Sequence, residues 1–322
     1  MIEIGYALSS EEHGPSHLVR NAVRAEEAGF SFALISDHFH PWTTRQGQSP
    51  FVWSVLGAIA ASTRRIRVGT GVTCPLIRMH PAIVAQAAAT TAAMMPGRFF
   101  LGVGTGENLN EHVTGARWPS ASERLEMLEE AIAVIRRLWA GEEVEHHGRH
   151  FDVIDARLFT APPERIQLHV AASGSQAAEL AGRLGDGLIA TSPNADVVSS
   201  FRAAGGRGPR IAQMSVCWAA TESEGRRVAL EWWPTAAIGG NLSQELPRPQ
   251  EFEAAAQLVT AGDVSEVVVC GPDPDRHLVA IREYEEAGFD RVYVHQVGPD
   301  QEGFIRFYRQ QILPNLGAAA AA

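Results

Sequence analysis

The 322-residue chain contains no lysine, so all 27 of its basic residues are arginine. Its 37 acidic residues outnumber them and give a formal net charge of −10, and no basic tract occurs along the sequence. An acidic chain without a basic patch repels nucleic-acid backbones and anionic lipid headgroups. We therefore expect neither nucleic acid nor a membrane surface as a partner.

Cysteine is almost as scarce. Cys74, Cys217 and Cys270 lie far apart and form no CxxC pair, so neither a disulfide framework nor a zinc site is expected. No apolar run is long enough to span a bilayer, and the acidic N-terminus lacks the basic segment of a signal peptide. These absences together predict a cytoplasmic protein.

Short apolar runs of strand type alternate with helical patterns along most of the chain. Such alternation implies a parallel sheet covered by helices. Eight strands favour a closed (β/α)8 TIM barrel over an open doubly wound sheet, in a single domain over residues 1–322 with a frayed alanine run at 318–322. We predict strands at 2–8, 31–36, 66–72, 99–104, 167–172, 187–190, 211–219 and 291–296, and helices at 16–28, 50–62, 81–93, 122–139 and 175–184.

Two segments interrupt this alternation. Residues 142–158 read as a short hairpin that carries His146, His147 and His150. These three histidines suit metal ligands, but no second partner cluster accompanies them, which favours an exposed hairpin. Residues 232–261, rich in proline and glycine, interrupt the seventh strand–helix unit, where a long insertion can cap the barrel mouth and shape a pocket.

If the fold is a barrel, its chemistry belongs at the C-terminal ends of the strands. The second predicted strand is followed by Asp37, His38 and Trp42. Histidine exchanges a proton near neutral pH, so an acid beside it and an indole four residues on suggest a proton-transfer site with an aromatic wall. Acids, hydroxyls and small residues follow the other strands, among them Glu11, Gly71–Thr73, Thr105–Glu107, Asn110, Ala171–Gly174, Ala190 and Thr191.

Two glycine-containing segments allow more than one interpretation. The run Gly102-x-Gly104-x-Gly106 lacks the GxGxxG spacing of a dinucleotide-binding fold, so it favours a turn or the close approach of a flat ligand. Ser173-Gly174, at a helix start, is suited to cradling a phosphate with free backbone N–H groups. An ordinary helix cap explains the same pair, and both interpretations stay open.

Four ordered motifs resemble the coenzyme F420-dependent branch of the bacterial luciferase-like barrel family. They lie at residues 37–42, 81–86, 96–98 and 102–107, and the likeness runs from Ile4 to about Thr191 and again, more weakly, over 271–316. Within that branch the chain resembles the F420-dependent glucose-6-phosphate dehydrogenases and the F420-dependent secondary alcohol dehydrogenases. The resemblance implies a luciferase-like TIM barrel, a small-molecule substrate and a homodimer.

The resemblance also implies catalytic roles. His38 matches the base that takes the hydroxyl proton as hydride leaves the same carbon for the deazaflavin. Trp42 matches an indole that steadies the developing charge, Glu107 the acid that protonates the reduced ring, and Glu11 a further active-site acid. The resemblance implies coenzyme F420 and no metal. The positions it assigns to the cofactor are Asp37, Gly71, Val72, Thr73, Thr105, Gly106, Asn110, Ala171, Ala172, Ser173, Gly174, Ala190 and Thr191, with a cis peptide at Gly71–Val72 and the phosphate at Ala172–Gly174.

The chain departs from the glucose-6-phosphate subgroup at the phosphate clamp. That subgroup uses two lysines and an arginine, where this chain has Asn194, Ala254 and Ala280. A buried phosphate dianion without cationic partners is very unfavourable, so a neutral alcohol or sugar is the expected substrate. Three arginines in this part of the chain are candidates to replace the clamp, although a solvated helix face explains them too: Arg248, Arg276 and Arg282.

Three alternatives to this function remain. One is an F420-dependent sugar-phosphate dehydrogenase with an altered clamp, and the second is an FMN-dependent luciferase-like monooxygenase. An oxygenase does not need the Asp-His-x-x-x-Trp arrangement of residues 37–42 for its chemistry, which ranks it lower. The third alternative is a protein that binds the deazaflavin without catalysis, and the complete His, Trp and Glu set argues against it.

Overall fold

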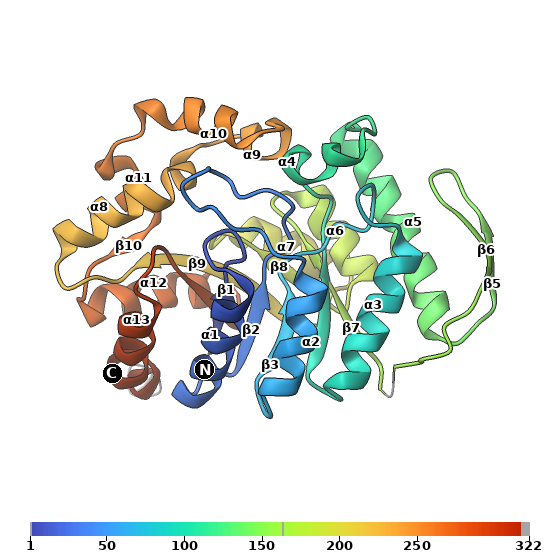
Figure 1. The fold of residues 1–322 in the computed structure, drawn as a ribbon, viewed down its shortest axis with the longest axis horizontal. Helices are drawn as coiled ribbons and strands as arrows, with labels where there is room; N and C mark the ends of the chain where they lie inside the picture. The colour runs from blue at the N-terminus through green and yellow to red at the C-terminus, as the bar shows by residue number, and fades with distance from the viewer. Residues whose placement is uncertain (1, 163, 317–322) are drawn as a thin grey trace.

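Eight parallel strands close into a barrel at the centre of this computed structural model, which describes residues 2–162 and 164–316 (Figure 1). The strands follow one another in the order β9, β11, β1, β2, β3, β4, β7, β8, and β8 pairs again with β9 to close the ring. The (β/α)8 prediction is therefore confirmed, while the alanine run at 318–322 lies outside the described residues. The barrel strands are β1 (Glu3–Leu8), β2 (Phe32–Ile35), β3 (Arg67–Thr70), β4 (Phe99–Val103), β7 (Gln167–Ala171), β8 (Gly187–Ala190), β9 (Arg210–Cys217) and β11 (Arg291–Gln296).

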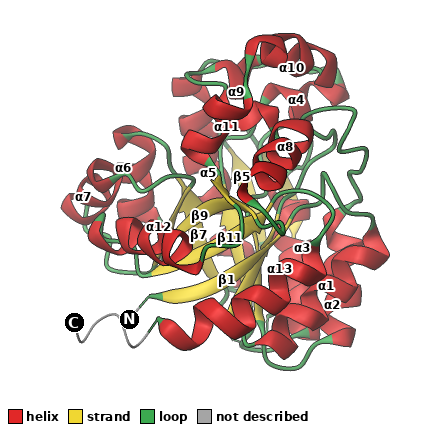
Figure 2. Cartoon of the chain, turned by 90° about the vertical axis from the view of Figure 1, so that its left-hand side faces the viewer, coloured by secondary structure: helices red, strands yellow, loops and turns green. Residues whose placement is uncertain are grey.

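The strands are buried on both faces, which explains why they read as continuous apolar runs. In β2, Phe32 and Leu34 point into the barrel, where they join a cluster with Phe100, Ile189 and Tyr293. The intervening β2 residues pack outward against the helices, because successive side chains of a strand alternate between faces. Figure 2 shows the strands as a core surrounded by helices.

The helices begin and end where local chemistry dictates. Helix α3 starts at a proline preceded by His80, whose side chain accepts the Ala82 N–H, and α1 ends at Gly29 with a φ of 98°. All five predicted helices are present within two residues of their predicted ends. They are α1 (Pro15–Ala28), α2 (Val52–Ser62), α3 (Pro81–Met94), α5 (Ala121–Trp139) and α6 (Ser175–Leu184). Four further helices were not predicted from the sequence, namely α7 (Ala195–Ala203), α8 (Glu222–Trp232), α12 (Pro274–Glu286) and α13 (Gln301–Phe307).

The first insertion is the predicted hairpin, formed by β5 (Val144–His147) and β6 (Asp152–Ala156), and it projects to one side of the barrel (Figure 1). His146 lies 3.0 Å from Glu130, and His147 contacts Glu145 and Asp152. These histidines thus pair with carboxylates. No group of three or more His, Cys, Asp or Glu is placed to hold a metal anywhere in residues 2–162 and 164–316.

The second insertion lies across the C-terminal end of the barrel (Figure 1). It contains η2 (Pro234–Ala237), α9 (Leu242–Glu245), α10 (Pro249–Ala255) and η3 (Ala256–Leu258), and α11 (Ala261–Val267) and β10 (Val269–Cys270) follow it. Hydrogen bonds fix it to the loops after β2 and β4. Thr44 donates its backbone N–H to Glu253, and the Asn108 side chain, in α4 (Asn108–Glu111), donates to the Glu245 carbonyl.

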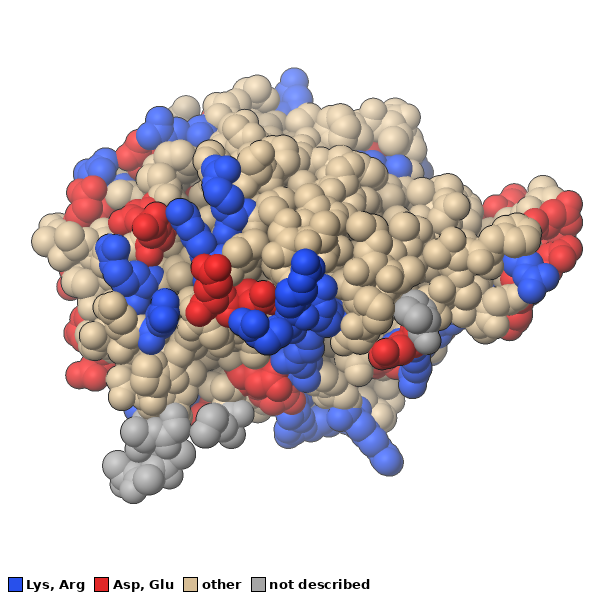
Figure 3. Space-filling model, turned by 60° about the horizontal axis from the view of Figure 1, so that its bottom comes forward, with Lys and Arg blue, Asp and Glu red and all other residues tan. Residues whose placement is uncertain are grey.

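The opposite end of the barrel carries ion pairs. Glu3 contacts Arg67 and Arg291, and Arg210 pairs with Asp290 at 2.6 Å, so that the first residues of β1, β3, β9 and β11 all take part. Figure 3 shows basic and acidic side chains intermixed on the lower face, without a large field of one sign. Such pairs stabilise partly exposed strand ends modestly. In the described chain, no helix has the length and apolarity that crossing a membrane requires.

Two buried imidazoles make stability depend on pH. Burial lowers the pKa of His169 and of His277 to about 4, whereas an unfolded histidine titrates near 6.5. The unfolded chain therefore binds protons between about pH 6.5 and 4 that the folded chain does not, and stability falls as the pH falls through this window. From pH 7 to pH 5, we expect each residue to contribute a loss of about 2 kcal/mol in the free energy of unfolding.

Urea unfolding at both pH values measures this loss. Because carboxylates titrate too, the informative quantity is the difference between the wild type and His169→Leu, whose pH-dependent loss should be smaller by about 2 kcal/mol. An equal loss in both proteins would mean that His169 does not stay neutral in the folded state.

Candidate active site

A cavity of about 1080 Å³ opens at the C-terminal ends of the strands, and both strand-end loops and the 232–261 insertion line it. The structure brings nearly all of the predicted site residues to this one cavity. Only Thr73 and Gly174 do not line it. The predicted residues that do are Glu11, Asp37, His38, Trp42, Gly71, Val72, Thr105, Gly106, Glu107, Asn110, Ala171, Ala172, Ser173, Ala190 and Thr191.

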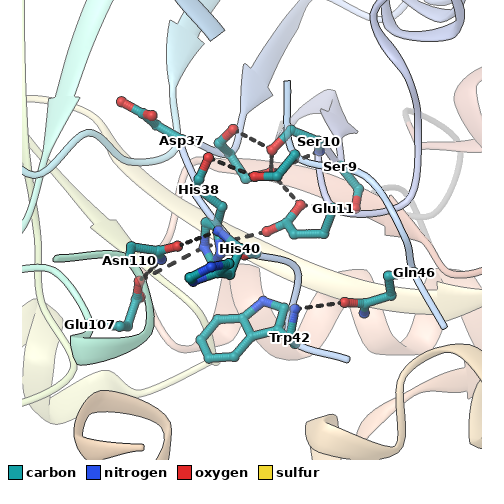
Figure 4. Close-up of polar contacts among 12 residues, drawn as sticks. Ser9, Ser10, Glu11, Asp37, His38, His40, Trp42, Gln46, Glu107 and Asn110 are labelled. Atoms are coloured by element: carbon teal, nitrogen blue, oxygen red, sulfur yellow. Dashed lines mark hydrogen bonds and ion pairs between the residues drawn. The ribbon is translucent and has the colours of Figure 1, made fainter. Parts of the chain in front are cut away.

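His38 lies between two carboxylates (Figure 4). Its Nδ1 is 3.2 Å from the carbonyl oxygen of His40. Since a carbonyl only accepts hydrogen bonds, Nδ1 carries the hydrogen, and Nε2 holds the lone pair of the neutral ring. Nε2 lies 3.3 Å from Oε1 of Glu11 and 3.8 Å from Oε2 of Glu107. The basic nitrogen therefore faces two groups that stabilise a proton placed on it.

Glu11 is held ready for this contact by the loops after β1 and β2. The hydroxyls of Ser36 and Ser9 donate to its Oε2 at 2.5 and 3.1 Å, which leaves Oε1 facing His38. Burial acts to raise the pKa of Glu11, but the positive charge of a protonated His38 and the hydrogen bond from the Ser36 hydroxyl outweigh it, and the pKa lies below its usual value. Glu11 is thus a carboxylate at neutral pH.

Asn110 fixes the loop that carries His38. Its Oδ1 accepts the backbone N–H groups of Phe39 and His40 at 2.9 and 3.2 Å, and its Nδ2 donates to Glu107 at 3.0 Å (Figure 4). One buried amide thereby positions both the His40 carbonyl and the Glu107 carboxylate. The sequence predicted Asn110 as a cofactor contact, and in the structure its polar atoms bind the protein.

Trp42 forms the aromatic wall beside the imidazole. The two ring centres are 5.0 Å apart, and Phe252 of α10 packs edge-on against the indole at 5.1 Å. Gln46 accepts the Trp42 backbone N–H at 2.9 Å and donates to the Trp232 carbonyl at 3.1 Å. The insertion therefore supports this wall directly, which sequence spacing alone did not reveal.

A buried ion network lies next to the cluster. Asp37 pairs with Arg78 at 2.8 Å and accepts the Thr73 hydroxyl at 2.8 Å, and the Arg78 backbone N–H donates to Glu111. Burial raises the pKa of Glu111 above its usual value. The carboxylate of Asp37 thus binds protein groups, although the residue lines the cavity. Arg78 and Glu111 had no local sequence signal, because Arg78 meets Asp37 and Glu111 only in the fold.

Small residues line the part of the cavity that follows β3, β4, β7 and β8. A Cβ atom added at Gly104 would come within 2.8 Å of Val72, and one added at Gly106, whose φ is 75°, within 2.6 Å of the Cys74 sulfur. A side chain at either position would clash with these neighbours, so this part of the cavity wall is bare backbone. The Gly71–Val72 peptide bond is cis, as the resemblance implies.

The mouth of the cavity is acidic. The carboxylates of Glu266, Asp275 and Glu283 line it and form no hydrogen bond or ion pair within the described chain, while the one arginine in the lining, Arg276, contacts Glu222 at 3.0 Å. Arg248 and Arg282 do not line the cavity. Of the three clamp positions only Ala280 lines it, and Asn194 caps α7 instead.

The sequence analysis missed a second imidazole in the lining. His295, on β11, lies 2.8 Å from Glu12, whose other oxygen accepts the Gly298 N–H. The alternation of β11 places His295 on the same inward face as Tyr293, and that periodicity was the available signal. Its partner is remote in sequence, so no local motif joins the two.

A parallel barrel with an imidazole between two carboxylates at its strand ends has the architecture of a barrel enzyme that transfers protons. The luciferase-like monooxygenase family model matches residues 1–291, and the chain belongs to this family.

Named relatives of the chain are F420-dependent glucose-6-phosphate dehydrogenases. That of Microbacterium testaceum is 36% identical, over 98% of this chain and 97% of that protein, and that of Nocardia farcinica is 34% identical, over 99% of each. Among solved structures, an F420-dependent secondary alcohol dehydrogenase in complex with an F420–acetone adduct superposes with a TM-score of 0.90 at 29% identity, over 98% of this chain and 99% of that one.

Proposed function

We propose that this protein is a coenzyme F420-dependent oxidoreductase that transfers hydride between a hydroxyl or carbonyl substrate and the deazaflavin. The observation that carries the proposal is the His38 cluster, with a bare Nε2 facing two carboxylates in a cavity at the strand ends. The dehydrogenase relatives and the superposition on an enzyme with an F420–acetone adduct support the same chemistry.

The residues present fit a flat cofactor. Gly104 and Gly106 leave the backbone of this wall without side chains, so a flat ligand can approach it closely. The bound deazaflavin supplies the hydride acceptor or donor. Gly71, Val72 and the strand-end residues after β4 and β8 would hold its ring. The loop before α6 would receive its phosphate, since no side chain caps that helix and the space beside Gly174 is open.

His38 handles the proton. Its Nε2 takes the proton of the substrate hydroxyl during oxidation and returns it during reduction, while the Nδ1 hydrogen bond to His40 keeps the ring in the required tautomer. Glu11 and Glu107 stabilise the imidazolium that forms, and the Trp42 ring at 5.0 Å adds a cation–π contact and excludes water. The resemblance assigns Glu107 a second role, in which its protonated form would supply a proton to the reduced ring.

A neutral alcohol or sugar is the substrate that the charges favour. Three carboxylates line the mouth, and Arg276 is already engaged with Glu222. A phosphate dianion there lacks free cationic partners. The glucose-6-phosphate dehydrogenase relatives keep a sugar phosphate as the second candidate, whereas the complete proton-transfer cluster disfavours an FMN oxygenase or a non-catalytic binder.

We also propose that residues 1–322 act as one domain, that the protein is cytoplasmic, and that it forms a homodimer. Three free buried cysteines support a reducing compartment. Exposed apolar side chains on and next to α2 and α3, namely Phe51, Ile83 and Met94, support an interface on that side of the barrel.

Replacement of the base tests the function. With coenzyme F420 and a secondary alcohol, His38→Ala should lower kcat by about 10²- to 10⁴-fold, because the positioned base is lost. Cofactor affinity, measured by fluorescence titration, should change little. His112→Ala is the matched control, since His112 stacks on His40 but does not line the cavity. Wild-type turnover in His38→Ala would remove the proposed base.

Substrate charge is tested by comparing glucose with glucose 6-phosphate. The wild type should show no preference for the phosphate ester. A cation added at the clamp position that lines the cavity, in the variant Ala280→Arg, should raise selectivity for it by about 10-fold or more. A strong wild-type preference for glucose 6-phosphate would mean that other groups hold the phosphate.

Light scattering measures the oligomeric state. We expect twice the 34.8 kDa chain mass at micromolar concentration. Ile83→Asp should give monomers because it buries a charge in the proposed interface, while Leu258→Asp, an exposed position on the insertion, should not. A monomeric wild type would contradict the dimer.

A further inference from the structure

His295 lines the cavity and forms with Glu12 a second imidazole–carboxylate pair besides that of His38. His295 and Glu12 are almost completely buried, and Nε2 of the imidazole lies 2.8 Å from Oε2 of the carboxylate. Oε1 of Glu12 accepts the Gly298 N–H at 2.8 Å. Because both carboxylate oxygens are engaged and only accept, Nε2 of His295 carries the hydrogen of this contact.

The two pairs are built alike from consecutive glutamates. Glu11 turns toward His38 after β2, and Glu12 turns toward His295 on β11, because β1 lies between β2 and β11 in the barrel. Each imidazole also packs against an indole that lines the cavity, Trp42 at 5.0 Å and Trp233 at 4.4 Å. His38 follows β2 and His295 lies on β11, with β1 between the two strands, so each ring belongs to a different side of the β1 loop.

Nδ1 of His295 is buried and has no hydrogen-bond partner in the described part of the chain. In the neutral ring this atom is an acceptor, held away from bulk water by its surroundings, where a hydrogen bond is strong. His169 also has an unpartnered Nδ1, but it has no carboxylate partner and does not line the cavity. The combination of carboxylate, indole and cavity distinguishes His295.

We infer that His295, oriented by Glu12, binds a second hydroxyl group of the substrate while His38 receives the proton of the first. This inference rests on the proposed function and deepens it: the substrate is a polyol or a sugar, with at least two hydroxyls, rather than a simple alcohol. The acidic mouth of the cavity accepts such neutral, hydrogen-bonding molecules.

Histidine NMR tests the contact without turnover. In ¹⁵N-histidine-labelled protein, the resonances missing from His295→Leu belong to His295. The probes are cyclohexanol and the three regioisomeric cyclohexanediols, which share one ring and one secondary carbinol. At least one diol should shift the Nδ1 resonance of His295, and cyclohexanol should not.

Kinetics with coenzyme F420 give the second readout. The diol that shifts His295 should exceed cyclohexanol in kcat/KM by roughly 10- to 100-fold in the wild type, because an anchoring hydrogen bond is otherwise left unmade. In His295→Leu this ratio should fall toward about 1, chiefly through KM for the diol. His295→Gln keeps an acceptor oxygen and should restore part of the preference. The buried-imidazole control, His169→Leu, should keep the wild-type ratio.

Different outcomes test the role of His295 and the proposed F420-dependent activity. The role of His295 is overturned if no diol shifts its Nδ1 resonance although the enzyme turns over, or if the preference for the diol survives in His295→Leu. Either result leaves the proposed F420-dependent activity intact. Absence of F420 turnover with every alcohol overturns the proposed function, and the inference falls with it as a statement about a substrate.

Discussion

The arrangement of the site depends on one hydrogen bond, from Nδ1 of His38 to the carbonyl of His40. It fixes which nitrogen of the imidazole is free, and so decides that Nε2, not Nδ1, faces Glu11 and Glu107. The carbonyl is itself placed because Asn110 binds the N–H of the same residue. The other neutral tautomer would direct an N–H at the carboxylates and its lone pair at the His40 carbonyl, and no basic nitrogen would face Glu11 and Glu107.

Closure of the barrel is the larger constraint. β11 returns beside β1, so the loop after the first strand has a neighbour on each side and two successive glutamates reach different imidazoles. An open sheet would leave β1 without one of these partners. The same closure places ion pairs at the opposite end, where Glu3 joins Arg67 and Arg291, so stability and chemistry occupy separate ends of the strands.

The sequence predicted the parts of this site that are local in the chain. Short apolar runs located all eight barrel strands, and residues just after a strand, such as His38 and Glu107, were assigned to the cavity because strand ends converge. Predictions were weakest where contacts are remote. Arg78 and His295 have no local motif, since their carboxylate partners come from other loops. The third strand ends at Thr70, two residues earlier than predicted, and the cis Gly71–Val72 bond follows it. Roles assigned to individual site residues stay predictions.

The contact of Gln46 with both Trp42 and Trp232 has a consequence for how this scaffold diversifies. The groups assigned to proton transfer lie on the strand-end loops, whereas the cover above them is a separate segment of the chain, joined to those loops by a few contacts, those of Gln46, Thr44 and Asn108 among them. Substitutions in that segment away from Phe252 and Trp232, which support Trp42, change the shape of the cavity without changing the strand-end residues. Specificity for new substrates can therefore arise through changes in the insertion, while the strand-end residues are kept.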